Sequence, residues 1–168
     1  YRHQGLCREL MTNAQEALAA RGYDGSVLVP ADDGLRQMYA AMGYRNFGGV
    51  ENLALPAGAP VPLREVTPEE YAALRRDYLP QGGIVQEDGA IEYLAESAKL
   101  YAGNGFLLAA AEDEPMELLG DASQAAGIVG ALGKDRGTFR LPGPSPFAMF
   151  RPICGDSWTP AYFGLDFA

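Results

Sequence analysis

The sequence predicts an α/β protein in which helices cover a mixed β-sheet, and three observations lead to this class. Apolar residues recur at helical spacing in residues 6–23 and again in residues 32–44. A short strand-like segment follows each of these stretches, at 25–30 and at 44–56. Helices that alternate with strands in this way are typical of a sheet covered by helices.

The first predicted helix has one apolar face and a clear stop signal. Its apolar residues at helical spacing are Leu6, Leu10, Met11, Ala14, Leu18 and Ala19. Gly22 follows the last of them, as is common just beyond the end of a helix. The strand that comes next is short and closes at Pro30.

The second predicted helix begins at Asp32 or Asp33, because either side chain can cap its first turn. It ends at Gly43, which is again a residue typical of the position after a helix. In the strand that follows, we expect a β-bulge at Gly48 and Gly49.

A segment rich in Pro, Ala and Gly at residues 56–62 predicts a linker and a domain boundary. We therefore expect one domain in residues 1–55, the N-terminal part, and another in residues 63–168, the C-terminal part.

The C-terminal part begins with a strand and then a helix that carries a capping box. Thr67 takes the N-cap, Pro68 the first helical position and Glu70 the third. We expect a further helix over residues 87–105.

The remaining segments predict a hairpin, a short helix and three strands. The hairpin spans 106–122, and its acidic tip at 112–114 is interpreted as a solvated turn. The helix spans 124–133. The expected strands are 137–143, 146–153 and 161–168, the last two adjacent in a mixed sheet that belongs to the C-terminal part alone.

The composition narrows the class of function. The chain has 168 residues, of which 48% are hydrophobic and 21% charged, as in an ordinary globular protein. No apolar run approaches the roughly 18 to 20 residues that a membrane span needs, and no signal-peptide pattern opens the chain. The net charge of −9 disfavours nucleic acid, which needs clustered Lys and Arg. We expect a cytoplasmic protein with neither a membrane nor a nucleic-acid partner.

Cysteine and histidine are too scarce for several kinds of site. Cys7 and Cys154 are the only cysteines, and they have no metal-ligand spacing, so we expect neither a disulfide scaffold nor a metal site. His3 is the only histidine, and it lies at the chain terminus. A solvated imidazole is therefore a simpler interpretation than a Ser–His–Asp or Cys–His catalytic site.

Two short motifs in the N-terminal part carry a resemblance to a known family. The marked positions are Arg2, Gly5 and Cys7 before the first helix, and Tyr39, Gly43 and Tyr44 in and after the second. An R-x-x-G-x-C turn, a helix, a strand and a helix with this tyrosine resemble the second half of a domain of the GNAT superfamily of N-acetyltransferases. The resemblance covers Arg2 to about Leu55, with cysteine where the family usually has Gly or Ala.

The resemblance implies that the turn binds the pyrophosphate of acetyl-CoA, the co-substrate. A helix N-terminus offers unpaired backbone N–H groups and a partial positive charge, which suit a phosphate. Gly5 lets the backbone approach it, and Cys7 is small enough not to block it. The alternative is that Gly5 only starts a helix and Cys7 packs as a small residue. The candidate cofactor-binding residues are Arg2, Gln4, Gly5, Leu6, Cys7 and Asp32.

Tyr39 has two interpretations. The resemblance implies a general acid that protonates the departing thiolate of coenzyme A, and a phenol has a pKa near that of a thiol. Alternatively, the ring only packs on its helix against Leu35 and Met42. Asp32 stands seven residues before this tyrosine, where the family often has an asparagine that contacts the cofactor. At this position the sequence departs from the family pattern.

The C-terminal part resembles a degenerate domain of the same family. Gln124, Gly127 and Val129 form a Q-x-x-G-x-V version of the turn, but a branched valine would crowd a pyrophosphate. No helix with a tyrosine follows it. An unrelated α+β domain is the alternative.

Two classes of function follow from the resemblance. The first is an acetyl-CoA-dependent N-acetyltransferase acting on a small-molecule or peptide amine, with the chain a fragment that lacks the first half of its first domain and is inactive alone. The second is a non-catalytic interaction or regulatory module. We expect an amine acceptor as partner, and self-association into a homo-oligomer stays open.

Overall fold

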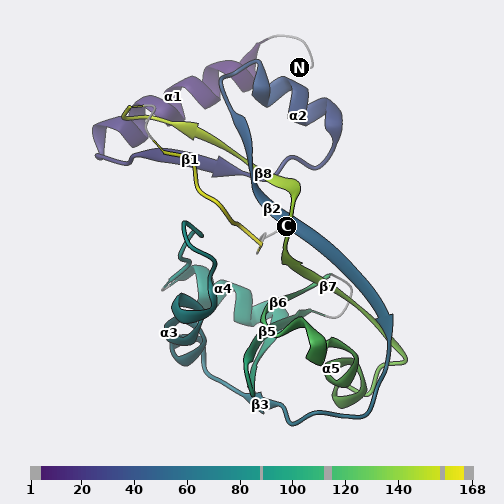
Figure 1. The fold of residues 1–168 in the computed structure, drawn as a ribbon. Coiled ribbons are helices and arrows are strands. Elements are labelled where there is room, and N and C mark those ends of the chain that lie inside the picture. Colours follow the sequence, from purple (N-terminus) through teal and green to yellow (C-terminus); the bar gives the residue numbers. More distant parts are fainter. Residues whose placement is uncertain (1–4, 88, 112–114, 156–157, 165–168) are drawn as a thin grey trace.

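The computed structural model describes residues 5–87, 89–111, 115–155 and 158–164, shown as a coloured ribbon in Figure 1. The helices are α1 Leu6–Ala20, α2 Asp33–Ala40, α3 Pro68–Tyr78, α4 Gly89–Ser97 and α5 Ala125–Ala131, with the short 3₁₀ helix η1 at Ala122–Gln124. The strands are β1 Gly25–Leu28, β2 Arg45–Pro56, β3 Arg64–Glu65, β4 Ala98–Gly103, β5 Phe106–Ala111, β6 Met116–Gly120, β7 Arg136–Pro142 and β8 Ser145–Pro152.

In the described part of the chain, the strands form one eight-stranded sheet in the order β1-β8-β2-β7-β6-β5-β4-β3. The α/β class with a mixed sheet is therefore confirmed: β6 and β7 run parallel, and the other neighbours are antiparallel. No helix in the described ranges is long and apolar enough to cross a bilayer.

The expectation that the C-terminal part forms a sheet of its own is wrong. The first residues of β2 pair with β8, and its last residues pair with β7. Strand β8 also pairs with β1, so it lies between two strands of the N-terminal part (Figure 1). The sequence pattern correctly marked 146–153 as a strand, but its partners are more than 90 residues away along the chain. A local pattern carries no information about such a partner.

The predicted strand at 161–168 is also wrong within the described residues. Residues 161–164 form only an isolated bridge, in which Tyr162 lies parallel to Gly83. The Tyr162 side chain is buried, and its hydroxyl donates to a carboxylate described below. Residues 165–168 and the predicted acidic tip at 112–114 lie outside the described residues.

The helix expected over 87–105 is helical only as far as Ser97, and β4 begins at the next residue. From Ala98 onward, burial alternates from residue to residue: Leu100 is buried and Lys99 is exposed. This period of two is the signature of a strand with one buried face.

The helix caps predicted from sequence are confirmed at two positions. The Asp32 side chain accepts a hydrogen bond from the Leu35 amide at 2.7 Å. The Thr67 hydroxyl accepts one from the Glu70 amide at 3.3 Å, and Pro68 is the first residue of α3. Each side-chain oxygen satisfies an amide that has no partner inside its helix.

The β-bulge expected at Gly48 and Gly49 is absent from this described strand. Phe47 faces Ala148 and Gly49 faces Pro146, so the register is the same on both sides of Gly48. Gly48 instead has a φ of 69°, and a Cβ atom there would lie 3.1 Å from the backbone nitrogen of Phe163. The glycine thus serves a close approach of another segment.

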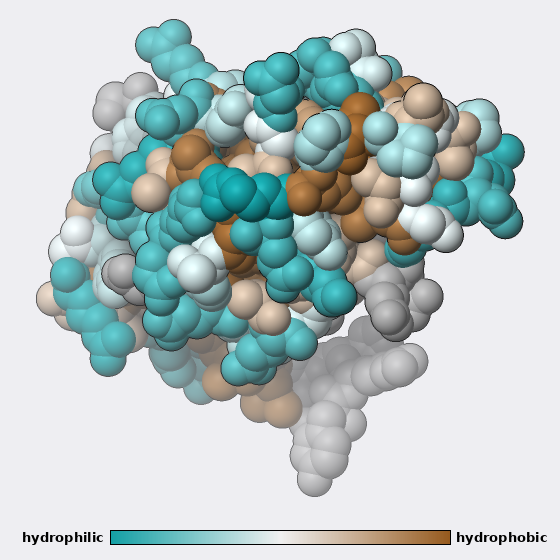
Figure 2. Space-filling model, turned by 90° about the horizontal axis from the view of Figure 1, so that it is seen from below, coloured by the Kyte–Doolittle hydropathy of each residue, from teal (hydrophilic) through white to brown (hydrophobic). Residues whose placement is uncertain are grey.

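The helices of the C-terminal part cover both faces of the sheet. Strand β6 shows the division: Met116 and Leu118 pack with α5, whereas Leu119 packs with α3 and α4. The face of the molecule shown in Figure 2 is mainly hydrophilic, with apolar residues in small groups.

The apolar face predicted for α1 is mostly uncovered. Leu10 is 68% exposed and Leu6 44% exposed, whereas Gln15 is the buried residue of this helix. The spacing correctly predicts a helix, but within the described residues the apolar stripe is not the side of the helix that is buried.

Candidate functional site

The turn before α1 is open. Gly5 is the N-cap of the helix, with a φ of 76°, and no atom of the described residues beyond its own neighbours in the chain lies within 4 Å of the position that its Cβ would occupy. No side chain in the described part of the chain caps this helix end. A left-handed backbone of this kind favours glycine, because other residues lose roughly 1 to 2 kcal/mol in it.

The first amides of α1 are the candidate ligand-binding groups. The Glu9 amide donates to the Gly5 carbonyl at 3.1 Å, which is the first intrahelical bond. In an α-helix, the amides before that point have no partner within the helix. Leu6 and Cys7 are both exposed there. Arg2, His3 and Gln4 lie outside the described residues.

Tyr39 lies on α2, half-buried, with its ring edge-on to Tyr44 at a centroid distance of 5.8 Å. Burial, the Cys7 thiol and Tyr44 together raise the pKa of the Tyr39 phenol above its usual value. The thiol of Cys7, in the turn before α1, is the second cause of this shift, after burial. The raised pKa favours the protonated phenol, the form that a proton donor needs. Leu35 and Met42 are also half-buried, so packing of the ring on its own helix stays an open interpretation.

Asp32 has a clear structural role. Its carboxylate caps α2 through the bond to Leu35, and the residue itself is exposed. The cap occupies one carboxylate oxygen, so helix capping explains the presence of Asp32 without a cofactor.

A hydrogen-bonded group behind Tyr39 was not predicted from the sequence. Gln15 Nε2 donates to Ser26 Oγ at 2.6 Å and to Tyr44 Oη at 2.7 Å, and these two hydroxyls are 2.9 Å apart. This group joins α1, β1 and the residue before β2, and so fixes the ring that contacts Tyr39. Gln15 stands beside Glu16 and outside the apolar stripe of its helix, so it looks like a surface residue in the sequence. One signal in the sequence indicates its burial: Gln15 lies four residues after Met11, and residues four apart share one side of a helix.

The second turn motif has different surroundings. Helix α5 begins at Ala125, with Gln124 as its N-cap, so Gly127 lies inside the helix rather than before it. A Cβ at Gly127 would meet Val61 Cγ1 at 2.5 Å and the Ala59 carbonyl at 2.9 Å. Residues 58–61 thus pack where a ligand would have to approach.

The predicted linker is held against α5 by its backbone. The Gly58 amide donates to the Ala126 carbonyl at 2.7 Å, and the Val61 amide donates to the Gly127 carbonyl at 3.3 Å. Val129 is fully buried. The motif Gln124, Gly127, Val129 therefore serves packing in this structure.

A buried ion pair in the C-terminal part was also missed from sequence. Glu117 on β6 and Arg75 on α3 are both buried, with Arg75 Nη2 donating to Glu117 Oε1 at 2.8 Å and Nε donating to Oε2 at 3.0 Å. Tyr71 Oη and Tyr162 Oη donate to the same carboxylate at 3.3 and 2.9 Å. Burial and then Glu117 raise the pKa of both phenols. We call Arg75, Glu117, Tyr71 and Tyr162 the buried cluster.

The net effect on Arg75 combines opposite causes. Burial lowers the pKa of its guanidinium, whereas the charge and hydrogen bonds of Glu117 raise it, and the outcome is a raised pKa. The guanidinium of Arg75 thus keeps its charge beside the carboxylate that pairs with it.

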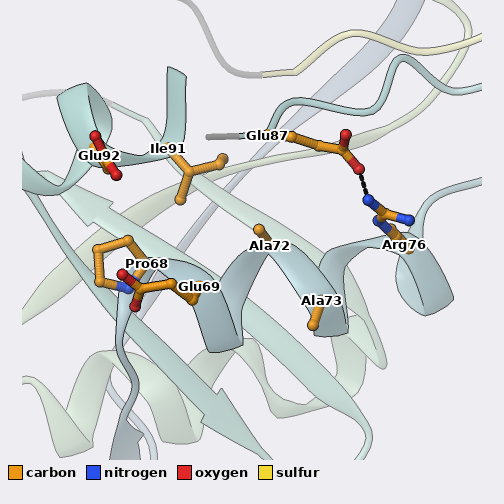
Figure 3. A pocket seen from close by; sticks show the side chains of 8 residues that line it. All are labelled: Pro68, Glu69, Ala72, Ala73, Arg76, Glu87, Ile91 and Glu92. Carbon is orange, nitrogen blue, oxygen red and sulfur yellow. Dashed lines mark hydrogen bonds and ion pairs between the residues drawn. The ribbon is translucent and has the colours of Figure 1, made fainter. Parts of the chain in front are cut away.

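A hollow of about 370 Å³ lies between α3 and α4 (Figure 3). It is lined by Pro68, Glu69, Ala72, Ala73, Arg76, Glu87, Ile91 and Glu92. Glu69 and Glu92 lie at one end, in the first turns of their helices, and an ion pair between Arg76 and Glu87 lies at the other. Carboxylates in a first turn complement the helix dipole, which accounts for their position without a ligand. None of the residues predicted to bind the cofactor lines this hollow.

Comparison with known proteins identifies the fold. No model of a protein family matches the sequence, and no curated protein sequence is similar to it. Among solved structures, the chain is similar to a GCN5-related N-acetyltransferase from Kribbella flavida, with a TM-score of 0.60 and 17% identity over 89% of this chain and 48% of that one. A GCN5-related N-acetyltransferase from Anabaena variabilis gives a TM-score of 0.59 at 17% identity over 91% and 52%.

Eis1 from Mycobacterium abscessus is similar as well, with a TM-score of 0.56 at 13% identity over 91% of this chain and 53% of that one. The chain thus spans about half the length of the structures that it matches. At these identities the likeness concerns the backbone arrangement. The chain has the fold of the GCN5-related N-acetyltransferases.

Proposed function

We propose that the chain is part of an acetyl-CoA-dependent N-acetyltransferase of the cytoplasm. The observation that carries this proposal is the open turn at Gly5 before α1. The raised pKa of Tyr39 on α2, to which burial and Cys7 contribute, supports a proton donor in the same part of the chain. The fold of N-acetyltransferases supports the same kind of activity.

The residues at the turn suit the pyrophosphate of coenzyme A. The free space beside Gly5 admits a phosphate to the backbone, and the first amides of α1 point to the end of the helix where an anion is stabilised. In this proposal Leu6 and Cys7 bind through their backbone amides. Arg2 and Gln4 keep the binding role that the resemblance implies. Asp32 contributes indirectly: it caps α2, the helix that carries Tyr39.

Tyr39 acts as the proton donor. Acetyl-CoA supplies the acetyl group as a thioester, and transfer forms a C–N bond to the amine while the C–S bond breaks. The phenol of Tyr39 holds its proton until the sulfur carries negative charge and then gives it up to that sulfur, which leaves as the thiol. The nitrogen loses one proton to water as the amide forms, and the Tyr39 phenolate takes a proton back from water. A pKa above the usual value keeps this proton in place before the transfer.

The acceptor is a small-molecule or peptide amine, and the net charge of −9 favours a cationic one by steering. Because the chain spans about half of the structures it matches, we propose that a longer protein completes the acetyl-binding side and that the 168 residues alone are inactive. The packed turn at Gly127 supports a non-catalytic role for the C-terminal part, as a degenerate second domain.

Binding of coenzyme A to this chain tests the turn. Gly5→Ala adds a methyl group where the phosphate must approach, and we expect it to weaken binding about tenfold or more, the loss expected when a charged hydrogen-bonding contact is broken. Gly133→Ala is the matched control, since Gly133 has a similar φ of 70° and no atom within 4 Å of its Cβ position. Equal effects of the two variants, measured by calorimetry, would refute the phosphate site.

Thiol release from acetyl-CoA by the longer protein, across a panel of amines, tests the activity. Tyr39→Phe should lower kcat by roughly 100-fold, the usual contribution of a general acid. Tyr23→Phe, at an exposed tyrosine, is the control and should be unchanged. Unchanged turnover in Tyr39→Phe would leave Tyr39 with a packing role only.

A further inference from the structure

The carboxyl ends of β6 and β7 form a crevice in the fold. These neighbours run parallel and pair only where Met116 faces Phe139 and Glu117 faces Arg140. Beyond that point, residues 118–120 continue β6 without pairing to β7. In open α/β sheets, ligands bind outside the carboxyl ends of parallel strands that diverge. This crevice is therefore where a ligand of the C-terminal part would lie.

Residues 161–164 lie at this crevice, and we call them the C-terminal strap. Both strands hold the strap at the point where they diverge. Tyr162 Oη donates to Glu117 Oε1 on β6 at 2.9 Å, and Arg140 Nη1 on β7 donates to the Gly164 carbonyl at 3.0 Å.

The backbone of the strap is fixed on its other side by the segment after α3. The Ala161 amide donates to the Gly82 carbonyl at 2.8 Å, and the Ile84 amide donates to the Tyr162 carbonyl at 2.9 Å. These two bonds make the isolated parallel bridge between Gly83 and Tyr162. In Figure 1 the described chain ends between the part of the molecule that holds α1 and α2 and the part that holds α3, α4 and α5.

No space is left where the strap is seated. Tyr162 is 1% exposed, and a Cβ at Gly164 would overlap the Tyr162 hydroxyl and lie 2.8 Å from Glu117 Oε1. The crevice is thus filled by a tyrosine whose hydroxyl satisfies a buried carboxylate.

The strap also contacts the N-terminal part. The Phe163 ring lies 6.5 Å from the ring of Phe47 on β2, and the Phe163 backbone passes beside Gly48. The same short segment therefore joins β2 to β6 and β7.

We propose that the C-terminal strap is a built-in occupant of this crevice: it excludes a nucleotide cofactor from the C-terminal part and fixes β2 against that part. The inference goes beyond the proposed function. It concerns the crevice between β6 and β7, and it holds whether or not the turn at Gly5 binds a phosphate.

Hydrogen exchange of the full chain, followed by NMR, tests the strap. Tyr162→Phe removes the hydroxyl donor to Glu117, and we expect the amides of Ile84 and Ala161 to exchange about tenfold faster, together, while β1 is unchanged. Tyr23→Phe is the control at an exposed position. Unchanged exchange at both amides would overturn the proposal. Should Tyr162→Phe not fold, Phe163→Ala is measured in the same way, with β2 as the additional reporter.

Addition of coenzyme A to the wild-type chain tests the exclusion separately. We expect no protection of residues 118–129 or of Ile84 at any concentration that protects α1. Protection of residues 118–129 would overturn the exclusion. Absence of protection at α1 would count against the proposed function alone, because it concerns Gly5 and leaves the contacts of Tyr162 unaffected.

Discussion

The turn at Gly5 and the turn at Gly127 share a short sequence pattern and have opposite surroundings. Gly5 lies before its helix, with a φ of 76° and open space around it. Gly127 lies inside α5, and residues 58–61 pack against it. The two motifs share the central glycine and its spacing, although Cys7 in the first is replaced by the branched Val129 in the second. The larger difference is the neighbour that the rest of the chain brings to each glycine. A glycine motif therefore indicates a close approach, and only the packing decides whether a ligand or the protein makes it.

The surroundings of the Gly5 turn and the crevice between β6 and β7 differ in the same sense. At Gly5, no described atom approaches the end of the helix. In the C-terminal part, the buried cluster and the strap fill the crevice. The filled crevice should contribute to stability, and the open turn should contribute little to it.

The largest expected effect concerns Glu117. Glu117→Ala leaves the buried guanidinium of Arg75 without its counter-ion, and we expect a loss of about 3 to 5 kcal/mol in the free energy of unfolding. Urea denaturation measures it. Glu65→Ala, at an exposed position on β3, is the control and should change stability by less than about 0.5 kcal/mol. A loss below about 1 kcal/mol for Glu117→Ala would contradict the view that this crevice is filled by a tightly coupled cluster.

The next effect concerns Gly127. Gly127→Val places a branched side chain against Val61 and the Ala59 carbonyl, and we expect a loss of about 2 to 3 kcal/mol from overpacking. Urea denaturation again gives the value. Val61→Ala in the same background removes one of the two opposing groups and should restore part of the stability. If Gly127→Val is neutral, the segment 58–61 does not pack on α5 as described, and the contrast with Gly5 loses its basis.

A smaller effect concerns the cap of the helix that carries Tyr39. Asp32→Ala removes the acceptor of the Leu35 amide and should cost about 1 kcal/mol, as should the matched Thr67→Ala on α3. Asp32→Asn keeps an acceptor and should retain most of the stability. In thermal unfolding, full stability of Asp32→Ala would show that the carboxylate is not a cap, and its role beside the candidate site would have to be reconsidered.

Local features were predictable from the sequence, because they depend on neighbours along the chain. Capping at Asp32 and Thr67 follows from residue types three positions apart. The end of α4 was missed, since the alternation of burial begins at Ala98 directly after the last helical residue, with no Gly or Pro between them.

Features that depend on distant partners were not predictable. Nothing near β8 in the sequence indicates that it pairs with β1 and β2. Glu117 stands between apolar residues of a strand, and its charge has meaning only once Arg75 and Tyr162 meet it in space. At the candidate site, Gly5 and Tyr39 were found through their motifs, whereas Gln15 was missed because its partners Ser26 and Tyr44 lie on other elements.

The smallest expected effect concerns the link between the open turn and Tyr39. The pKa of Tyr39 is raised by burial first, then by Cys7 and Tyr44, so Cys7→Ser should lower this pKa slightly toward its usual value. A folded-state pKa above the unfolded one stabilises the protein below pH about 10 and is lost as the pH rises through the folded value. Cys7→Ser should therefore reduce the loss of stability at alkaline pH. The reduction should be small, because Tyr39 is only half-buried and solvent screens its interactions.

NMR titration of tyrosine labelled at the Cζ carbon measures this pKa directly. Cys154→Ser, at the other exposed cysteine, is the matched control and should leave Tyr39 unchanged. If both variants leave the pKa of Tyr39 where it was, the thiol does not face the phenol. The turn before α1 and Tyr39 on α2 would then be separate features of the N-terminal part. A proton donor for a thioester bound at the turn has to respond to a charge placed at the start of α1. A shift in Cys7→Ser alone would instead place Gly5, Cys7 and Tyr39 around one space, the arrangement that the turn at Gly127 lacks.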